Sequence, residues 1–301
     1  MIKKVLILGI SCASLLASET QYGHGTYSLE GGFMGFGAKM STDIDSYSLV
    51  EQHSNIFGSN FYYGYNVTWY DSKVIKQAQK FFDTQVNQAS SLINGYMPGG
   101  LQNGTKILMA PLKYDYQGLD AQVKLGYDIL HKSEHNFLGV NAILGISFPY
   151  INTHSSSSNS QLVGVAKKAF KASKTEFETY RLGIGLEGQK SLNDFFTIYA
   201  STGIAKQFGK IKNGYAKADF NAHGTYTYLD AGLRFDFTNY KKDLFDIYTI
   251  SPRLYLKAGY RYTQWKYNNI GIDVSGLSLK FNKGDMKMST SVGYVSIGYN
   301  F

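Results

Sequence analysis

Cysteine and proline are scarce in this sequence, and long uninterrupted apolar segments are absent. Cys12 is the only cysteine among 301 residues, and there are four prolines. Because Cys12 lies close to the N-terminus, a chain processed beyond it has neither disulfides nor thiol chemistry. No later segment is apolar over the roughly 18 residues that a transmembrane helix needs, which excludes an α-helical membrane protein.

The charge balance is basic but not strongly so. Thirty Lys and Arg residues face 22 Asp and Glu residues, which gives a formal net charge of +8. The surplus lies in predicted loops rather than in a groove of aromatic and basic residues, so we expect no nucleic-acid partner. The sequence is instead rich in Gly, Tyr and Phe, with 32, 25 and 19 residues. This composition fits a transmembrane β-barrel, in which aromatics face lipid and glycines suit the lumen and the turns.

The first eighteen residues have the organisation of a secretory signal peptide. Lys3 and Lys4 precede an apolar stretch, and the small residues Ala17 and Ser18 follow it. This pattern predicts a signal peptide over residues 1–18 and a mature chain over residues 19–301. A lipoprotein attached at Cys12 is disfavoured, because Gly9 stands where that motif requires a branched apolar residue.

The last eleven residues alternate between two faces. Val295, Ile297, Tyr299 and Phe301 fall on one side of a period-2 strand that ends at the chain terminus. This segment resembles the closing strand of Gram-negative outer-membrane β-barrels, in which a terminal Phe is the membrane-insertion signal. The resemblance implies a location in the cell outer membrane, the barrel-assembly machinery as a partner, and Tyr299 and Phe301 as the signal. The Tyr- and Lys-rich composition is also similar to that of small outer-membrane proteins of the Helicobacter–Campylobacter group.

The same alternation recurs along the chain, most clearly over residues 118–129. There Val123 and Leu125 share one face, while Asp120 and Lys124 share the other. Further strands are predicted over residues 27–36, 46–52, 63–69, 138–148, 180–186, 196–204, 229–237, 254–262 and 291–301. The sequence therefore predicts an all-β fold, an antiparallel up-and-down transmembrane β-barrel of ten strands, with eight or twelve as alternatives. The chain terminus and the short connections are expected on the periplasmic side.

Two long connections carry patterns of their own. Residues 72–95 place apolar side chains at helical spacing, with Ser72 as a candidate cap, and predict a helical insertion. This helix is expected either to lie over the rim or to plug the lumen. Residues 151–174 predict a Ser- and Lys-rich external loop. Its lysines are expected to contact lipopolysaccharide phosphates or a surface partner; they are Lys167, Lys168, Lys171 and Lys174.

Charged residues on the predicted inward faces are balanced in number, which favours a lumen filled by paired charges. The acids are Glu30, Asp120, Asp128, Glu187, Asp230 and Asp236, and the bases are Lys124, Arg181, Arg234, Arg253, Lys257 and Arg261. Single buried charges are costly, whereas a paired network is tolerated, and a barrel of this size is nearly filled by side chains. The alternative is a selectivity track for anions, formed by Arg253, Lys257 and Arg261.

Possible catalytic and metal-binding patterns are weak. The spacing of His131, Glu134 and His135 matches a zinc motif that works on a helix, but here it falls in a predicted hairpin turn. His154 and Ser156 lie in the Ser-rich loop, without a base or oxyanion site that the sequence can identify.

Outer-membrane proteases of the omptin type use an Asp pair opposite an Asp-His pair at the barrel mouth. This sequence has no Asp-x-His pair, and Asp43 and Asp45 are predicted to be polar loop residues. We therefore expect no catalytic residues, no metal and no cofactor. The predicted function is a non-enzymatic outer-membrane barrel whose loops contact glycolipid or surface partners. The alternatives are a narrow anion-preferring channel or small-solute porin and, third, an outer-membrane hydrolase of the protease or lipase type.

Overall fold

The structure is a computed structural model, which describes most of the chain after residue 18. The described residues are 19–33, 36–54, 56–76, 112–130, 136–155, 175–213, 218–237, 254–274, 277–280 and 285–299. Among them, no helix is long and apolar enough to cross a membrane. The predicted signal peptide, the lysines of residues 167–174, Arg253 and Phe301 lie outside the described residues.

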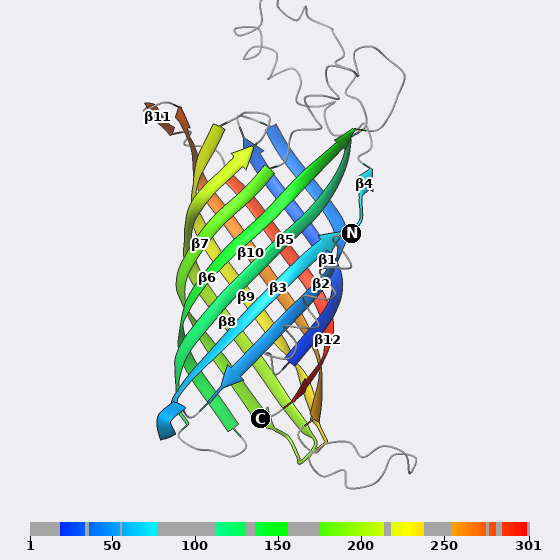
Figure 1. Ribbon diagram of the computed structural model, residues 1–301, viewed down its shortest axis with the longest axis vertical. Coiled ribbons are helices and arrows are strands. Elements are labelled where there is room, and N and C mark those ends of the chain that lie inside the picture. The colour runs from blue at the N-terminus through cyan, green and yellow to red at the C-terminus, as the bar shows by residue number, and fades with distance from the viewer. Residues whose placement is uncertain are drawn as a thin grey trace, which may run out of the picture.

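Ten long antiparallel strands make up the structure (Figure 1). They are β1 (Glu19–Phe33), β2 (Phe36–His53), β3 (Phe61–Ser72), β5 (Leu112–Asp128), β6 (Asn136–Ser155), β7 (Thr175–Ser191), β8 (Phe196–Asn213), β9 (Ala218–Asp236), β10 (Leu254–Val274) and β12 (Asp285–Tyr299). Two short strands, β4 (Ile75–Lys76) and β11 (Leu277–Lys280), and one 3-10 turn, η1 (Ile56–Gly58), complete the described elements.

The sheet closes on itself, so the molecule is a barrel. Each long strand pairs with its neighbour in sequence, and β12 pairs with both β10 and β1. The closed, ten-stranded antiparallel barrel confirms the predicted fold and strand number. Closure satisfies the backbone hydrogen bonds of every long strand, which is the condition for a sheet to cross a membrane.

The two ends of the barrel differ in their connections. Glu19 and Tyr299 lie at one end, which we call the terminal end and which is at the bottom of Figure 1. Strands β7 and β8 are joined there by four residues, 192–195, and strands β2 and β3 by residues 54–60, which include η1. The opposite end, where β1 and β10 finish, is called the far end.

Side chains alternate between a lipid-type outer surface and a filled interior. On β5 the exposed Val123 and Leu125 point outward, while the buried Gln122 points inward. The outward positions of β6, β7 and β8 are likewise mainly aliphatic or aromatic, as in transmembrane barrels. Strand β1 is an exception, because His24 and Thr26 point outward there.

The predicted helix does not begin where its pattern starts. Ser72 is the last residue of β3, and Ile75–Lys76 forms β4, which pairs with β5. Instead of capping a helix, the Ser72 hydroxyl accepts a hydrogen bond from the Tyr116 backbone N–H at 2.7 Å. The predicted start at Ser72 is therefore wrong, because sheet pairing extends through this segment. Residues 77–95 lie outside the described residues.

The predicted Ser- and Lys-rich loop, residues 151–174, also begins later than expected, because residues 151–155 belong to β6.

Candidate functional site in the barrel lumen

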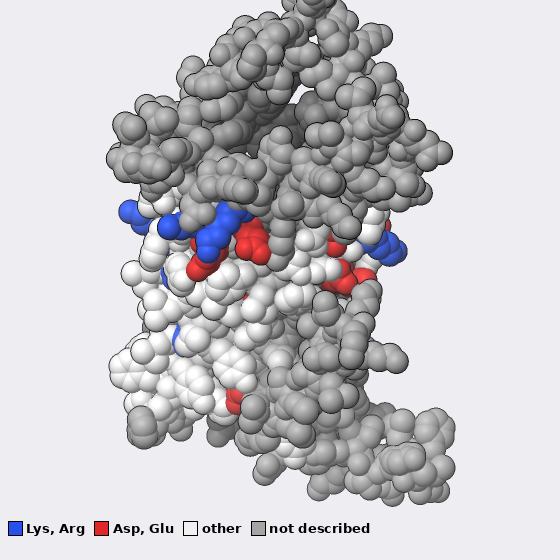
Figure 2. Space-filling model, turned by 45° about the horizontal axis from the view of Figure 1, so that its top comes forward, with Lys and Arg blue, Asp and Glu red and all other residues white. Residues whose placement is uncertain are grey.

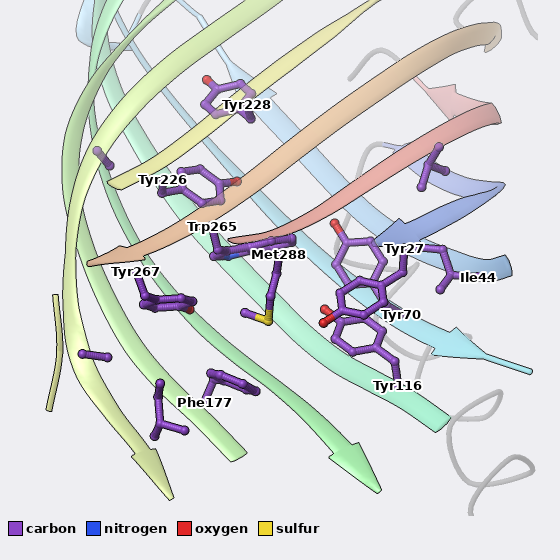
Figure 3. Close-up of a cluster of buried hydrophobic side chains, with 14 of the residues drawn as sticks. Tyr27, Ile44, Tyr70, Tyr116, Phe177, Tyr226, Tyr228, Trp265, Tyr267 and Met288 are labelled. Atoms are coloured by element: carbon purple, nitrogen blue, oxygen red, sulfur yellow. The ribbon is translucent and has the colours of Figure 1, made fainter. Parts of the chain in front are cut away.

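Large aromatic side chains fill the far half of the lumen. Tyr27 and Tyr116 stack with ring centroids 3.7 Å apart, and Phe177 stacks on Tyr267 at 5.9 Å. The indole of Trp265 is 1% exposed and lies beside Tyr226. Figure 3 shows these rings, drawn from strands around the barrel, converging on one layer with Met288 among them. This aromatic layer packs the described part of the lumen toward the far end.

Arg181 and Asp120 form an ion pair directly beside the aromatic layer. Two guanidinium nitrogens of Arg181 each donate to one carboxylate oxygen of Asp120, both at 2.6 Å. The side chains are 2% and 10% exposed, so the pair is removed from solvent. Ser147 accepts from Arg181 and from the Trp265 indole, and donates to Asp120. The hydroxyl thus joins the charge pair to the aromatic layer.

Arg261 and Asp230 form a second pair, across the β9–β10 ladder. The two residues are direct partners in the sheet, and an Arg261 nitrogen lies 2.7 Å from an Asp230 carboxylate oxygen. Arg261 also donates a hydrogen bond at 2.8 Å to Gln21 on β1, the strand that pairs with the other edge of β12. Tyr294 donates to the other Asp230 oxygen, at 2.6 Å. The pair therefore fills the width of the lumen rather than lining a path through it.

A third pair, Lys124 and Glu187, spans strands β5 and β7. The ammonium and a carboxylate oxygen are 3.2 Å apart. The same oxygen accepts a hydrogen bond from the Asn141 amide at 2.6 Å, and Tyr62 donates to it at 3.4 Å. The carboxylate is therefore held from three sides.

Two further pairs lie near the terminal end. Lys257 binds Glu19 on β1, and Arg234 lies 2.5 Å from Asp236 on its own strand. The guanidinium of Arg234 also stacks on the Tyr255 ring, 4.0 Å from its centroid.

Glu19 was not among the predicted lumen residues. It precedes the first predicted strand, and the predicted alternation, with Glu30 inward, would have placed it outward; the buried Gln21 and Tyr27 show that odd-numbered residues of β1 point inward.

The remaining predicted lumen residues do not join this network. Asp128 accepts hydrogen bonds from the backbone N–H groups of Leu130 and Leu138, so it caps a turn at the terminal end. Glu30 was predicted to point inward, and the structure contradicts this. Tyr27 is fully buried on the inward face of β1, so Glu30, an odd number of residues away, points outward. The reason is that the inward face is apolar at this height, where Leu29 packs on the aromatic cluster.

Little space remains between the paired charges. A cavity of ≈ 110 Å³ lies among Lys124, Glu187, Asp230, Lys257 and Arg261. It contains both signs of charge, and its cations are already neutralised by carboxylates. Such a cavity is polar enough to hold a few ordered waters.

Two histidines, His24 and His53, contact carboxylates on the outer wall. Nδ1 of His24 is 2.8 Å from an Asp45 carboxylate oxygen, and Tyr22 donates to the same oxygen at 3.1 Å. His53 is hydrogen bonded to Glu51. Asp45 lies in β2, so its interpretation as a loop residue was wrong. The sequence did not predict these pairs, because His24, Asp45 and His53 lie just outside the predicted strands 27–36 and 46–52, whereas β1 and β2 include them.

These pairs do not form a recognised catalytic or metal site. In the part of the chain that the structure describes, no hydroxyl is hydrogen bonded to the second nitrogen of His24. The described residues also contain no group of three or more His, Cys, Asp or Glu side chains that could hold a metal ion. The residues of the other patterns, His131, Glu134, His135 and Ser156, lie outside the described residues.

Comparison with known proteins gives matches in structure only. No protein-family model and no curated protein matches the chain. The outer membrane protease OmpT from Escherichia coli matches 94% of this chain and 96% of its own at 10% identity, with a TM-score of 0.49. The match to the translocator domain of the autotransporter NalP from Neisseria meningitidis covers 99% of this chain and 96% of that domain, at 11% identity and a TM-score of 0.34. The match to the Pseudomonas putida toluene transporter TodX covers 96% of this chain and 93% of that protein, at 13% identity and a TM-score of 0.29. Similarity at this level assigns neither a family nor an activity to the chain.

Proposed function

We propose that this protein is an outer-membrane β-barrel with a closed lumen, which serves a structural or surface-contact role and does not conduct solutes. The outward apolar belt and the polar interior support the membrane location. The alternating terminal strand, with Tyr299 and Phe301 as its aromatic end, supports insertion by the barrel-assembly machinery. Loops at the far end would then meet lipopolysaccharide or a surface partner.

The packing of the described lumen residues is the observation on which this proposal depends. The aromatic layer lies in the far half, and the ion pairs between Arg181 and Asp120 and between Arg261 and Asp230 occupy space below it. Breaking one buried pair to admit a solute would leave an uncompensated charge, which costs about 3–5 kcal/mol. The described lumen therefore favours a scaffold over a pore.

Single-channel recording in planar bilayers tests this proposal. We expect no steady conductance from the wild-type protein, and a measurable conductance from a Trp265→Ala/Tyr70→Ala variant, in which two rings of the aromatic layer are truncated. Phe208→Ala is the matched control, because Phe208 lies on the outer wall and is 45% exposed. A steady nanosiemens-scale conductance from the wild type would overturn the closed-lumen proposal.

The second candidate is a narrow anion-preferring channel, in which Lys257 and Arg261 form a cationic track. Both residues do lie inward on β10, one above the other. However, Lys257 is bound to Glu19 and Arg261 to Asp230, so the track carries little free positive charge. Anion selectivity in reversal-potential measurements on a conducting wild type would favour this channel.

A hydrolase is the third candidate, and the hydrogen-bonded His24 and Asp45 would be its candidate catalytic pair.

A further inference from the structure

Three lysines lie on the outer wall in the part of the barrel toward the far end. Lys206 on β8 is flanked by the inward, buried Ala205 and Gln207, so its own side chain points outward. Lys266 is flanked in the same way by Trp265 and Tyr267.

Lys287 on β12 follows the same rule, because its neighbour Met288 is fully buried. Along β10 the outward residues change from Leu256 and Tyr260 to Lys266 as the strand approaches the far end. On β8, however, Phe208 points outward beyond Lys206 and is 45% exposed, so the lysines overlap the far edge of the apolar belt. Figure 2 shows acidic and basic side chains together toward this end of the described wall.

The sheet register brings these lysines into one row. Lys287 is the direct partner of Lys266 across the β10–β12 ladder. Lys266 pairs with Thr225 on β9, and Thr225 pairs with Lys206 on β8. Like charges directly opposite each other on one face of a sheet are destabilising. The row is therefore unfavourable in the absence of an anion.

Among the residues that the structure describes, no carboxylate forms an ion pair with the row. Over the described ranges, no ion pair involves Lys206, Lys266 or Lys287, although Glu30 stands opposite Lys287 on β1. The described lysines of the lumen behave differently, since Lys124 and Lys257 each meet a carboxylate. One acid against three lysines leaves the row with an excess of positive charge.

An open groove lies beside the row, between β8, β9 and β10. It has a volume of ≈ 450 Å³ and is lined by Ile204, Lys206, His223, Thr225 and Asn268, among others. Ile204 is 54% exposed and belongs to the apolar belt, whereas Lys206 begins the charged row. The groove therefore runs from an apolar surface to a cationic one. A ligand that fits it has an apolar chain attached to an anionic head.

We propose that the row and its groove bind a phosphorylated glycolipid of the outer leaflet, with phosphates between Lys266 and Lys287 and an acyl chain along Ile204. This inference rests on the proposed membrane location, with the far end facing outward. Two lysines facing each other match a multiply charged phosphate head better than a singly charged one. Ammonium groups bind phosphate as point charges, and salt screens this attraction at exposed sites.

The test compares two probes and two variants of the folded, full-length protein in nanodiscs. The probes are a diphosphorylated lipid A and the same lipid without phosphates. The test variant is Lys266→Gln/Lys287→Gln. The control is Lys190→Gln, because Lys190 is an exposed lysine near the terminal end of β7. We expect the test variant to lose affinity for the diphosphorylated probe by about 30-fold, from roughly 1 kcal/mol for each lysine near an anionic surface. The control and the unphosphorylated probe should show no such loss.

A stability measurement provides a second, independent readout. In lipid-free detergent the double variant should resist unfolding at least as well as the wild type, because two opposed charges have been removed. With diphosphorylated lipid A added, the wild type should become the more stable of the two.

Equal affinity of wild type and test variant for the diphosphorylated probe would overturn the proposal. Binding of phosphatidylglycerol nanodiscs as tightly as lipid A would overturn the assignment to a glycolipid. Neither outcome depends on conductance, so the closed-lumen proposal is tested separately.

Discussion

At the scale of single residues, Arg181 and Asp120 are the pair whose loss should cost most. Arg181→Met leaves the Asp120 carboxylate buried and unpaired, and we expect it to lower the free energy of unfolding by about 3–5 kcal/mol. Replacing both residues, as in Arg181→Met/Asp120→Leu, should recover most of that loss, because no charge then remains buried. Urea unfolding in detergent micelles, followed by heat-modifiable migration on gels, measures both effects.

The exposed pair between Lys212 and Glu178 is the control for that experiment. Its atoms are 2.7 Å apart, but the side chains are 44% and 34% exposed. Lys212→Gln should therefore change stability by less than about 1 kcal/mol. If Arg181→Met proved as mild as this control, the lumen network would not be the stabilising feature that its geometry indicates.

The predicted faces of individual residues differ from the structure where the lumen is apolar. Asp230 and Arg261 were both predicted to point inward, and the structure places them in direct register. Glu30 was misplaced because the prediction assigned polar residues to the lumen and apolar ones to lipid. At the height of Leu29 this assignment is reversed, since the lumen there holds the aromatic layer.

At the scale of one element, β5 tests which face meets lipid. Val123 is 53% exposed, points outward and lies near the middle of its strand. Val123→Arg should therefore lower the free energy of unfolding by about 2–4 kcal/mol in liposomes. Gln117→Arg, on the same face but closer to the far end, should cost about 0–1 kcal/mol. Chemical unfolding of both variants in the same liposomes makes the comparison.

The inward neighbour of Val123 completes that test. Lys124 pairs with Glu187, so Lys124→Gln removes one of several groups that hold the carboxylate. Its effect should fall between those of the two arginine variants. If Gln117→Arg were as damaging as Val123→Arg, the apolar belt would extend further toward the far end than the outward residues indicate.

The strands are longer than their alternation predicted, and the physical reason is the same in each. The predicted segment 254–262 is the first part of β10, which continues to Val274. Toward the far end, β8 carries Lys206 and Lys210 outward, on either side of the outward Phe208, and the buried Ile211 inward. The expected pattern of apolar outward and polar inward therefore breaks down there, while backbone pairing continues.

At the scale of the whole molecule, the strand number could be predicted but the contacts inside the lumen could not. Alternation identifies each strand and its two faces, and parity then requires an even number of strands. Contacts between strands that are not neighbours depend on the stagger of the closed sheet, which no local pattern encodes. Lys257 on β10 reaches Glu19 on β1 past the Ser296 hydroxyl of β12, which also donates to Glu19.

Membrane orientation is the property of the whole barrel on which the glycolipid proposal depends. The mature chain is expected to lack cysteine, so single cysteines report position without background. Asp194→Cys places a thiol in the short β7–β8 turn at the terminal end, where Asp194 is exposed. Ser157→Cys places one in the long segment between β6 and β7. Short turns of outer-membrane barrels face the periplasm and long loops face outward. A membrane-impermeant maleimide should therefore label the Ser157→Cys variant on intact cells.

The Asp194→Cys variant should react with the same reagent only after the outer membrane is breached. Equal labelling after detergent lysis is the control for reactivity, because both thiols are then accessible. The reverse pattern, with the Asp194→Cys variant labelled on intact cells, would place the lysine row at the periplasmic edge of the bilayer. The row would then face the inner leaflet, and an outer-leaflet glycolipid could not reach it. Such a result would leave the closed lumen untouched, because the ion pairs and the aromatic layer do not depend on which end faces outward.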